Sequence, residues 1–111
     1  MQHFKVIFLE EADKFIASLD QKAVKKLLYN LDLAEQINDP RLFKKLRDEI
    51  WEFRVRHGNS QIRLLAFWDK SVSTNTLVVA THGFMKKVDK VPANEIERAR
   101  NIRNKYFQAK K

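Results

Sequence analysis

Arginine side chains recur at spacings suited to a phosphate backbone in two segments that read as neighbouring strands. In the segment IWEFRVR, Arg54 and Arg56 share one face with Glu52 and alternate with apolar residues, and Arg63 lies between apolar residues in the next segment. Residues two apart on a strand point to one face about 7 Å apart, which matches successive phosphates of RNA. Guanidinium groups bind phosphate through paired hydrogen bonds. We therefore expect Arg54 and Arg63 to be catalytic and Arg56 to bind RNA.

Metal-free RNA cleavage also needs a group that takes the 2′-hydroxyl proton and cations that stabilise the phosphorane. His82 lies late in a strand-like segment, and the ordinary pKa of histidine near 6.5 suits proton transfer at neutral pH. We expect His82 and Lys86 to be catalytic, and Lys45, Phe84 and Lys87 to bind RNA, with Phe84 stacking on a base.

Each of these interpretations has a structural alternative. Arg63 could form a salt bridge with Glu52 across the strands. His82 could be a sheet histidine held by a neighbour, and Phe84 could belong to the core. We assign Trp51 and Trp68 to the core or to a groove for a partner protein, not to catalysis.

The positive charge lies entirely in the second half of the chain. Residues 1–50 hold nine basic and nine acidic side chains, whereas residues 51–111 hold thirteen basic and five acidic, so 13 − 5 gives the whole net charge of +8. A one-sided excess of this kind creates a field that attracts a polyanion. The charge favours a nucleic acid or an acidic protein as partner.

Composition bounds the remaining possibilities. The length of 111 residues suits one domain spanning 1–111, and 44% hydrophobic residues allow a packed core. The absence of cysteine excludes disulfides and thiolate metal sites. The first residues lack a signal-peptide pattern, and no run of residues is apolar enough to span a membrane. We expect a cytoplasmic protein with no cofactor, no metal and no membrane partner.

The hydrophobic pattern predicts an α+β fold in the order β-α-α-β-β-β-α. A mainly antiparallel twisted sheet is expected with flanking helices. Asp20 is the expected N-cap of the second helix, whose apolar stripe is Val24, Leu27, Leu28, Leu31 and Ala34. The expected strands are His3–Leu9, Ile50–Arg56, Gln61–Trp68 and Thr76–Phe84, and the expected helices are Glu10–Leu19, Gln21–Ile37 and Ala93–Phe107.

Five motifs in this order resemble the RelE/ParE toxin superfamily, in its HigB-like branch. They are LFKKL at 42–46, IWEFR at 50–54, IRLLAF at 62–67, THGFMKK at 81–87, and Pro92 with Glu95 at the start of the last helix. The resemblance spans roughly residues 3–107. It implies a RelE-like fold and a toxin of a type II toxin–antitoxin system. It also implies an endoribonuclease that cleaves ribosome-bound mRNA and a helix-turn-helix, HigA-like antitoxin as partner.

One feature departs from this superfamily. Several ribosome-dependent members place a tyrosine just after the last strand, whereas the tyrosines here are Tyr29 and Tyr106, both in predicted helices. The proton-transfer residue is therefore open. Two other functions share parts of the pattern: a ParE-like inhibitor of DNA gyrase, and a non-catalytic RNA-binding module.

Overall fold

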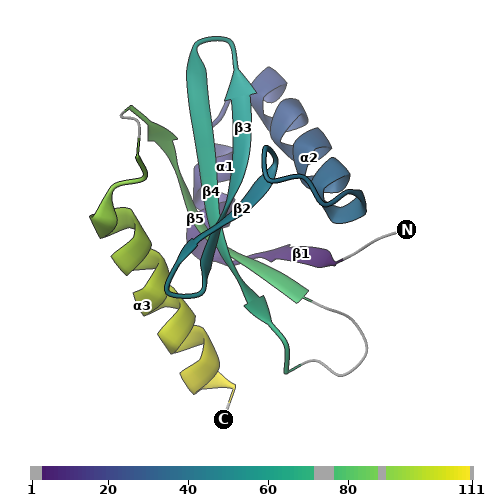
Figure 1. The fold of residues 1–111 in the computed structure, drawn as a ribbon. Coiled ribbons are helices and arrows are strands. Elements are labelled where there is room, and N and C mark those ends of the chain that lie inside the picture. The colour runs from purple at the N-terminus through teal and green to yellow at the C-terminus, as the bar shows by residue number, and fades with distance from the viewer. Residues whose placement is uncertain (1–3, 72–76, 88–89, 111) are drawn as a thin grey trace.

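The protein has an α+β fold in which helices cover both faces of one sheet (Figure 1). The structure is a computed structural model that describes residues 4–71, 77–87 and 90–110. Within these residues the strands are β1 (Lys5–Phe8), β2 (Phe43–Arg47), β3 (Ile50–His57), β4 (Ser60–Asp69) and β5 (Leu77–Lys86), and the helices are α1 (Glu10–Ala17), α2 (Gln21–Gln36) and α3 (Ala93–Ala109). The expected strand starts His3 and Thr76 lie outside the described residues.

The strand order in the sheet is β1-β5-β4-β3-β2. The β1 strand pairs parallel to β5, and the other neighbouring pairs are antiparallel. The predicted α+β class and mainly antiparallel sheet are thus confirmed. No helix in the described part of the chain is long and apolar enough to cross a membrane.

The β2 strand was not predicted. Its sequence FKKLR does not alternate in polarity, because Lys44 and Lys45 are adjacent and point to opposite faces of the sheet. Lysines on an edge strand also hinder pairing with another chain. The turn to β3 places Asp48 and Glu49 at φ 53° and 66°, as a two-residue hairpin turn requires, although neither is glycine.

The second helix follows most of its predicted pattern. The Asp20 carboxylate caps α2 by accepting from the Ala23 amide at 2.8 Å, as expected. Ala23, Leu27, Leu31 and Ala34 are the buried residues of the helix. The prediction for Leu28 was wrong, because its side chain is turned about 100° from Leu27 around the helix and is 47% exposed.

Two hydrophobic cores lie on the two faces of the sheet. The larger lies under α1 and α2 and contains most of the aromatic side chains, including Phe43 and Phe53. The smaller lies under α3, where Ile96 and Ala99 pack on Leu65 and Phe67. Because α3 covers only part of its face, the rest of that face carries the polar residues described next.

Candidate nucleic-acid interface

The sheet brings most of the predicted site residues together on one face. Arg54 of β3 pairs with Arg63 of β4, which pairs with Phe84 of β5, and these three form one row across the sheet. The next row toward the hairpin tip is Arg56, Gln61 and Lys86, and the row on the other side is Glu52, Leu65 and His82. Directly paired residues share a face, so the register explains the convergence.

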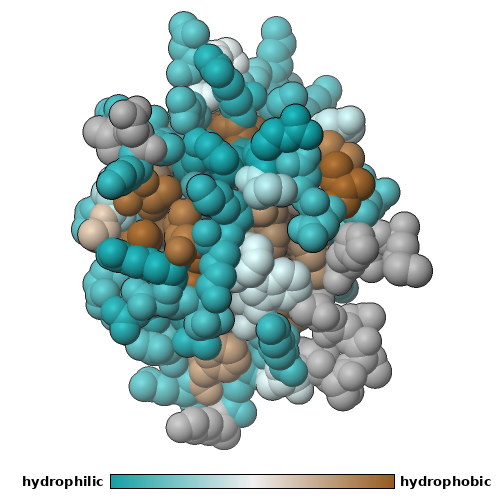
Figure 2. Space-filling model, in the orientation of Figure 1, coloured by the Kyte–Doolittle hydropathy of each residue, from teal (hydrophilic) through white to brown (hydrophobic). Residues whose placement is uncertain are grey.

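Two adjoining hollows on this face are lined by cations. One, of about 290 Å³, is lined by Arg41, Arg54, Val55, Arg56, Gln61 and Arg63. The other, of about 300 Å³, is lined by Lys44, Leu46, Glu52, Arg54, Lys86, Lys90, Val91 and Ile96. Arg54 lines both hollows. We call the seven cations Arg41, Lys44, Arg54, Arg56, Arg63, Lys86 and Lys90 the basic face. Figure 2 shows a mainly hydrophilic surface around the upper end of the molecule, where the β3–β4 hairpin ends in Figure 1.

Arg63 lies at the bottom of the basic face rather than on its surface. Its side chain is 4% exposed, and its Nε lies 3.0 Å from Oε1 of Glu52, within ion-pair distance though not aligned for a hydrogen bond. The guanidinium donates instead to the Ile62 carbonyl at 3.1 Å and to Gln61 Oε1 at 3.0 Å. The salt bridge with Glu52, the structural alternative for Arg63, is therefore present. Burial lowers the pKa of Arg63, and Glu52 opposes that shift.

Arg54 is the more accessible of the two predicted catalytic arginines. Its side chain is 35% exposed, and its Nε lies 4.0 Å from Oε2 of Glu52. The buried Glu52 carboxylate thus lies between two guanidinium groups and holds both near the centre of the basic face. Among the described residues that line the two hollows, Glu52 is the only carboxylate, and Arg54 and Arg63 share it.

His82 is buried, with 1% of its surface exposed. Its Nε2 lies 3.0 Å from Oε1 of Glu95 on α3, and its Nδ1 lies 3.1 Å from the Thr81 hydroxyl. Burial lowers its pKa, and the bond to Glu95 opposes that shift. In the neutral form Nε2–H donates to Glu95, and the Thr81 hydroxyl lies within hydrogen-bond distance of both Nδ1 and the Leu65 carbonyl, at 3.1 and 3.2 Å. Both ring nitrogens are therefore engaged, as in the structural alternative for His82.

The remaining predicted residues divide between the two faces. Lys87 is exposed directly after β5, and Phe84 is half-buried against the core under α3. Lys45 is opposite Trp51 in the β2–β3 pairing and so lies on the other face, where it pairs with Glu49 at 3.5 Å. The structure does not bring Lys45 to the basic face.

Three cations of the basic face were not predicted as site residues: Arg41, Lys44 and Lys90. A prediction of β2 and of its pairing with β3 would have selected Lys44, because Lys44 pairs with Glu52. No local pattern distinguishes Arg41 or Lys90 from other surface cations of the chain.

Neither tyrosine lies on the basic face. The Tyr106 hydroxyl donates to Asp69 at 2.7 Å, and Asp69 is six residues along β4 from Arg63, about 20 Å. Tyr29 is 62% exposed on α2, which packs on the opposite face of the sheet. Among the described residues, His, Asp and Glu side chains do not gather in a group of three that could hold a metal ion.

The chain belongs to the family of phage-derived Gp49-like proteins (DUF891), whose family model matches residues 14–104. This family is part of the RelE/ParE-like toxin superfamily. It is a toxin-like family, for which an antitoxin partner is expected in general. No curated protein is significantly similar to this chain. The matched residues include β2 to β5 and most of α3, so they contain the whole basic face.

Proposed function

We propose that this protein is the toxin of a HigB-like toxin–antitoxin pair and acts as a metal-free endoribonuclease on ribosome-bound mRNA. Membership of a toxin-like family supports the toxin role. The observation that carries the proposal is the basic face, where seven cations, of which Arg41 is paired with Asp39, adjoin the buried carboxylate of Glu52. A polyanion is the partner that such a surface attracts, and phosphate is the group that clustered guanidinium side chains bind best.

In the proposed reaction the 2′-oxygen attacks the neighbouring phosphorus, the bond to the 5′-oxygen breaks, and a cyclic phosphate remains. The 2′-hydroxyl loses a proton and the 5′-oxygen gains one. Arg54 and Lys86 would stabilise the charge that develops on the phosphorane, and Arg56 and Lys44 would bind flanking phosphates. Arg63 lies deeper in the sheet, where its positive charge would add to that of Arg54 and Lys86 and would help to fix the positions of these cations.

Proton transfer is the step of this reaction for which the site has the fewest suitable side chains. His82 could serve as the shuttle only if its bond to Glu95 broke, because both ring nitrogens are engaged. Phe84 and Lys87 would contact the RNA beside the reacting phosphate. We therefore propose slow cleavage by the isolated protein and faster cleavage on the ribosome, where other groups can accept and supply the protons.

A translation reaction with purified components tests this function. Wild-type protein is expected to cleave a translated mRNA, and Arg54→Ala is expected to reduce the rate by about 10²–10³ while circular dichroism is unchanged. Arg100→Ala is the matched control, because Arg100 is an exposed arginine on α3, outside the two hollows. Intact mRNA together with gyrase-dependent DNA breaks would place the protein with the ParE-like inhibitors.

A non-catalytic RNA-binding module is the second candidate, and the burial of both His82 and Arg63 favours it. Such a module would keep the basic face but would lack any group that moves a proton. It would bind ribosomes and inhibit translation with the mRNA intact. The same reaction separates the two functions when the RNA ends and the protein yield are both measured.

A further inference from the structure

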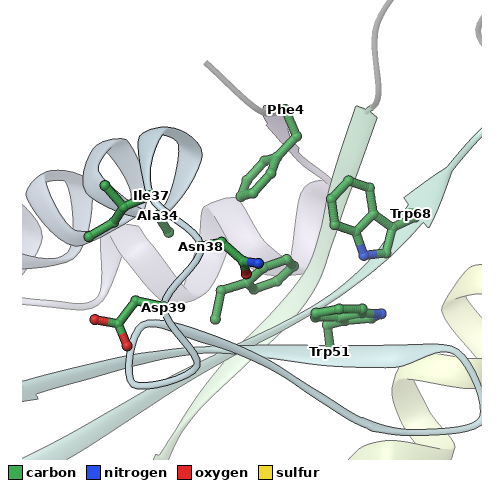
Figure 3. Close-up of a pocket in the computed structure, with 8 residues that line it drawn as sticks. Phe4, Ala34, Ile37, Asn38, Asp39, Trp51 and Trp68 are labelled. Atoms are coloured by element: carbon green, nitrogen blue, oxygen red, sulfur yellow. The ribbon is translucent and has the colours of Figure 1, made fainter. Parts of the chain in front are cut away.

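An aromatic pocket lies on the face of the sheet opposite the basic face. Its volume is about 330 Å³, and it is lined by Phe4, Ala34, Ile37, Asn38, Asp39, Phe43, Trp51 and Trp68. Figure 3 shows Ile37 on the side of the pocket opposite the two indole rings, with Phe4 between them. Pockets with aromatic walls are typical places for the anchor residue of a protein partner.

One buried hydrogen-bond donor in this pocket has no partner in the described part of the chain. Trp68 packs edge-on against Phe4 and Trp51, and its Nε1 is buried with no acceptor within reach among the residues that the structure describes. Indole N–H groups usually find an acceptor when they are removed from water. An occupant that carries a carbonyl or carboxylate oxygen beside an apolar group would satisfy this donor.

An exposed apolar stripe on α2 leads to the pocket. Tyr29 and Leu33 are four residues apart and lie along one side of the helix, and Ile37 follows as the C-cap residue that lines the pocket. Tyr29 is 62% exposed and Ile37 is 44% exposed, although both are large and apolar. We call Tyr29, Leu33, Ile37, Trp51 and Trp68 the α2 docking surface.

The charges around this surface select an acidic partner. Lys22 and Lys26 are exposed on the same side of α2 as Leu33, because 22, 26 and 33 are four and seven residues apart. Of the acidic residues of α2, Glu35 accepts a hydrogen bond from the Val6 amide of β1, and Asp32 is exposed one turn beyond Tyr29, so the two lysines outnumber the one exposed carboxylate of the helix. At the pocket, Asp39 is neutralised by Arg41 at 2.8 Å.

We propose that the α2 docking surface binds an acidic amphipathic helix of the antitoxin. One apolar side chain would enter the pocket, an oxygen acceptor beside it would bind Trp68 Nε1, and carboxylates would reach Lys22 and Lys26. This is helix-in-groove recognition with charged flanks. The inference rests on the antitoxin partner that membership of a toxin-like family implies, and it does not depend on RNA cleavage.

The two tryptophans of the chain allow a direct test, because both line the pocket. The full chain, carrying Arg54→Ala to permit expression, is labelled with 5-fluorotryptophan. The probe is the unlabelled protein encoded by the reading frame next to this gene. Binding should shift both fluorine signals. Ile37→Glu should weaken binding at least tenfold, whereas Leu28→Glu, at 47% exposure on the other side of α2, should change it less than twofold.

Lys26→Glu should also weaken the complex and reduce the dependence of its Kd on salt. Three results would overturn the proposal: no complex with the neighbouring protein, a complex that leaves both fluorine signals in place, or equal effects of Ile37→Glu and Leu28→Glu. The protein could also form a dimer with itself in the absence of the partner. If Ile37→Glu abolished that dimer, a second copy of the chain would be the occupant of the surface, and the proposal would be overturned. Cleavage of mRNA by the unbound protein is measured separately, so failure of the proposed function would be recognised independently.

Discussion

The carboxylate of Glu52 lies 3.0 Å from the guanidinium of Arg63, and both side chains are almost completely buried within the sheet. Removing one member of such a pair leaves an uncompensated charge in a region of low polarity. The pair therefore determines how any experiment on Arg63 must be interpreted, because loss of activity and loss of folding would coincide there.

The first prediction concerns this pair. Arg63→Met is expected to lower the free energy of unfolding by about 3–5 kcal/mol, because Glu52 loses its counter-ion. The double variant Glu52→Gln with Arg63→Met should recover most of that loss. Arg54→Met, at a side chain 35% exposed, should change stability by only about 0.5 kcal/mol. Urea unfolding of the wild type and the three variants measures these differences. Full stability of Arg63→Met would show that the ion pair does not stabilise the fold.

The second prediction compares two adjacent lysines on opposite faces of the sheet. Lys44 lines the basic face, whereas Lys45 pairs with Glu49 on the other face. Lys44→Ala should weaken binding to ribosomes and reduce the log–log salt slope by about 0.7–0.9, the value for one phosphate contact. Lys45→Ala should leave the slope unchanged. Titrations of ribosome binding between low and moderate salt measure the two slopes. The prediction fails if Lys44→Ala and Lys45→Ala change the slope equally.

The third prediction concerns the acid sensitivity that His82 brings. Its pKa in the folded state lies below the ordinary 6.5, mainly through burial, and Glu95, Arg98 and Glu11 act on it as well. The unfolded chain therefore binds the proton more readily, so stability is full above about pH 6.5 and falls as the pH drops below it. His82→Gln should reduce this loss, whereas His57→Gln, at the end of β3, should keep it.

Denaturant unfolding at several pH values measures the effect, and proton NMR titration of the imidazole gives the pKa of His82 directly. A His82 pKa at or above 6.5 would contradict the burial argument. If His82→Gln folds and still cleaves mRNA, a proton shuttle at His82 is also excluded.

The fourth prediction uses the two tyrosines. The Tyr106 hydroxyl donates to the buried Asp69, as do Lys110 and Ser71. Burial by itself would raise the pKa of Asp69, but these hydrogen bonds together hold it well below its usual range. Tyr106→Phe is expected to lower stability by about 1–2 kcal/mol. Tyr29→Phe, at an exposed position, should have no measurable effect.

Neither tyrosine variant should reduce mRNA cleavage, because both hydroxyls lie away from the basic face. Thermal unfolding and the translation reaction check the two parts of this prediction. A loss of cleavage in Tyr106→Phe at full stability would instead give that tyrosine a role in the reaction.

The sequence by itself determined the features that depend on neighbours along the chain. The alternation in IWEFRVR and the turn at Gly58 were sufficient for the β3–β4 hairpin and for the shared face of Arg54 and Arg56, whereas the observed register added Arg63 to that face. Asp20 was recognisable as a helix cap because the cap bonds an amide three residues away. These signals depend only on residues close together in the sequence, so they can be recognised from hydrophobic periodicity and from the residue types at turns and helix ends.

The tertiary structure decided which charges are buried and which reach the surface. His82 is buried because α3 brings Glu95 against β5, and Arg63 is buried because Glu52 of the neighbouring strand compensates its charge. Lys44 and Lys45 are equivalent in the sequence until β2 pairs with β3. The exposure of a side chain depends on segments distant in sequence that pack over it. The chemistry of single residues was therefore readable from the sequence, while their access to RNA required the packed fold.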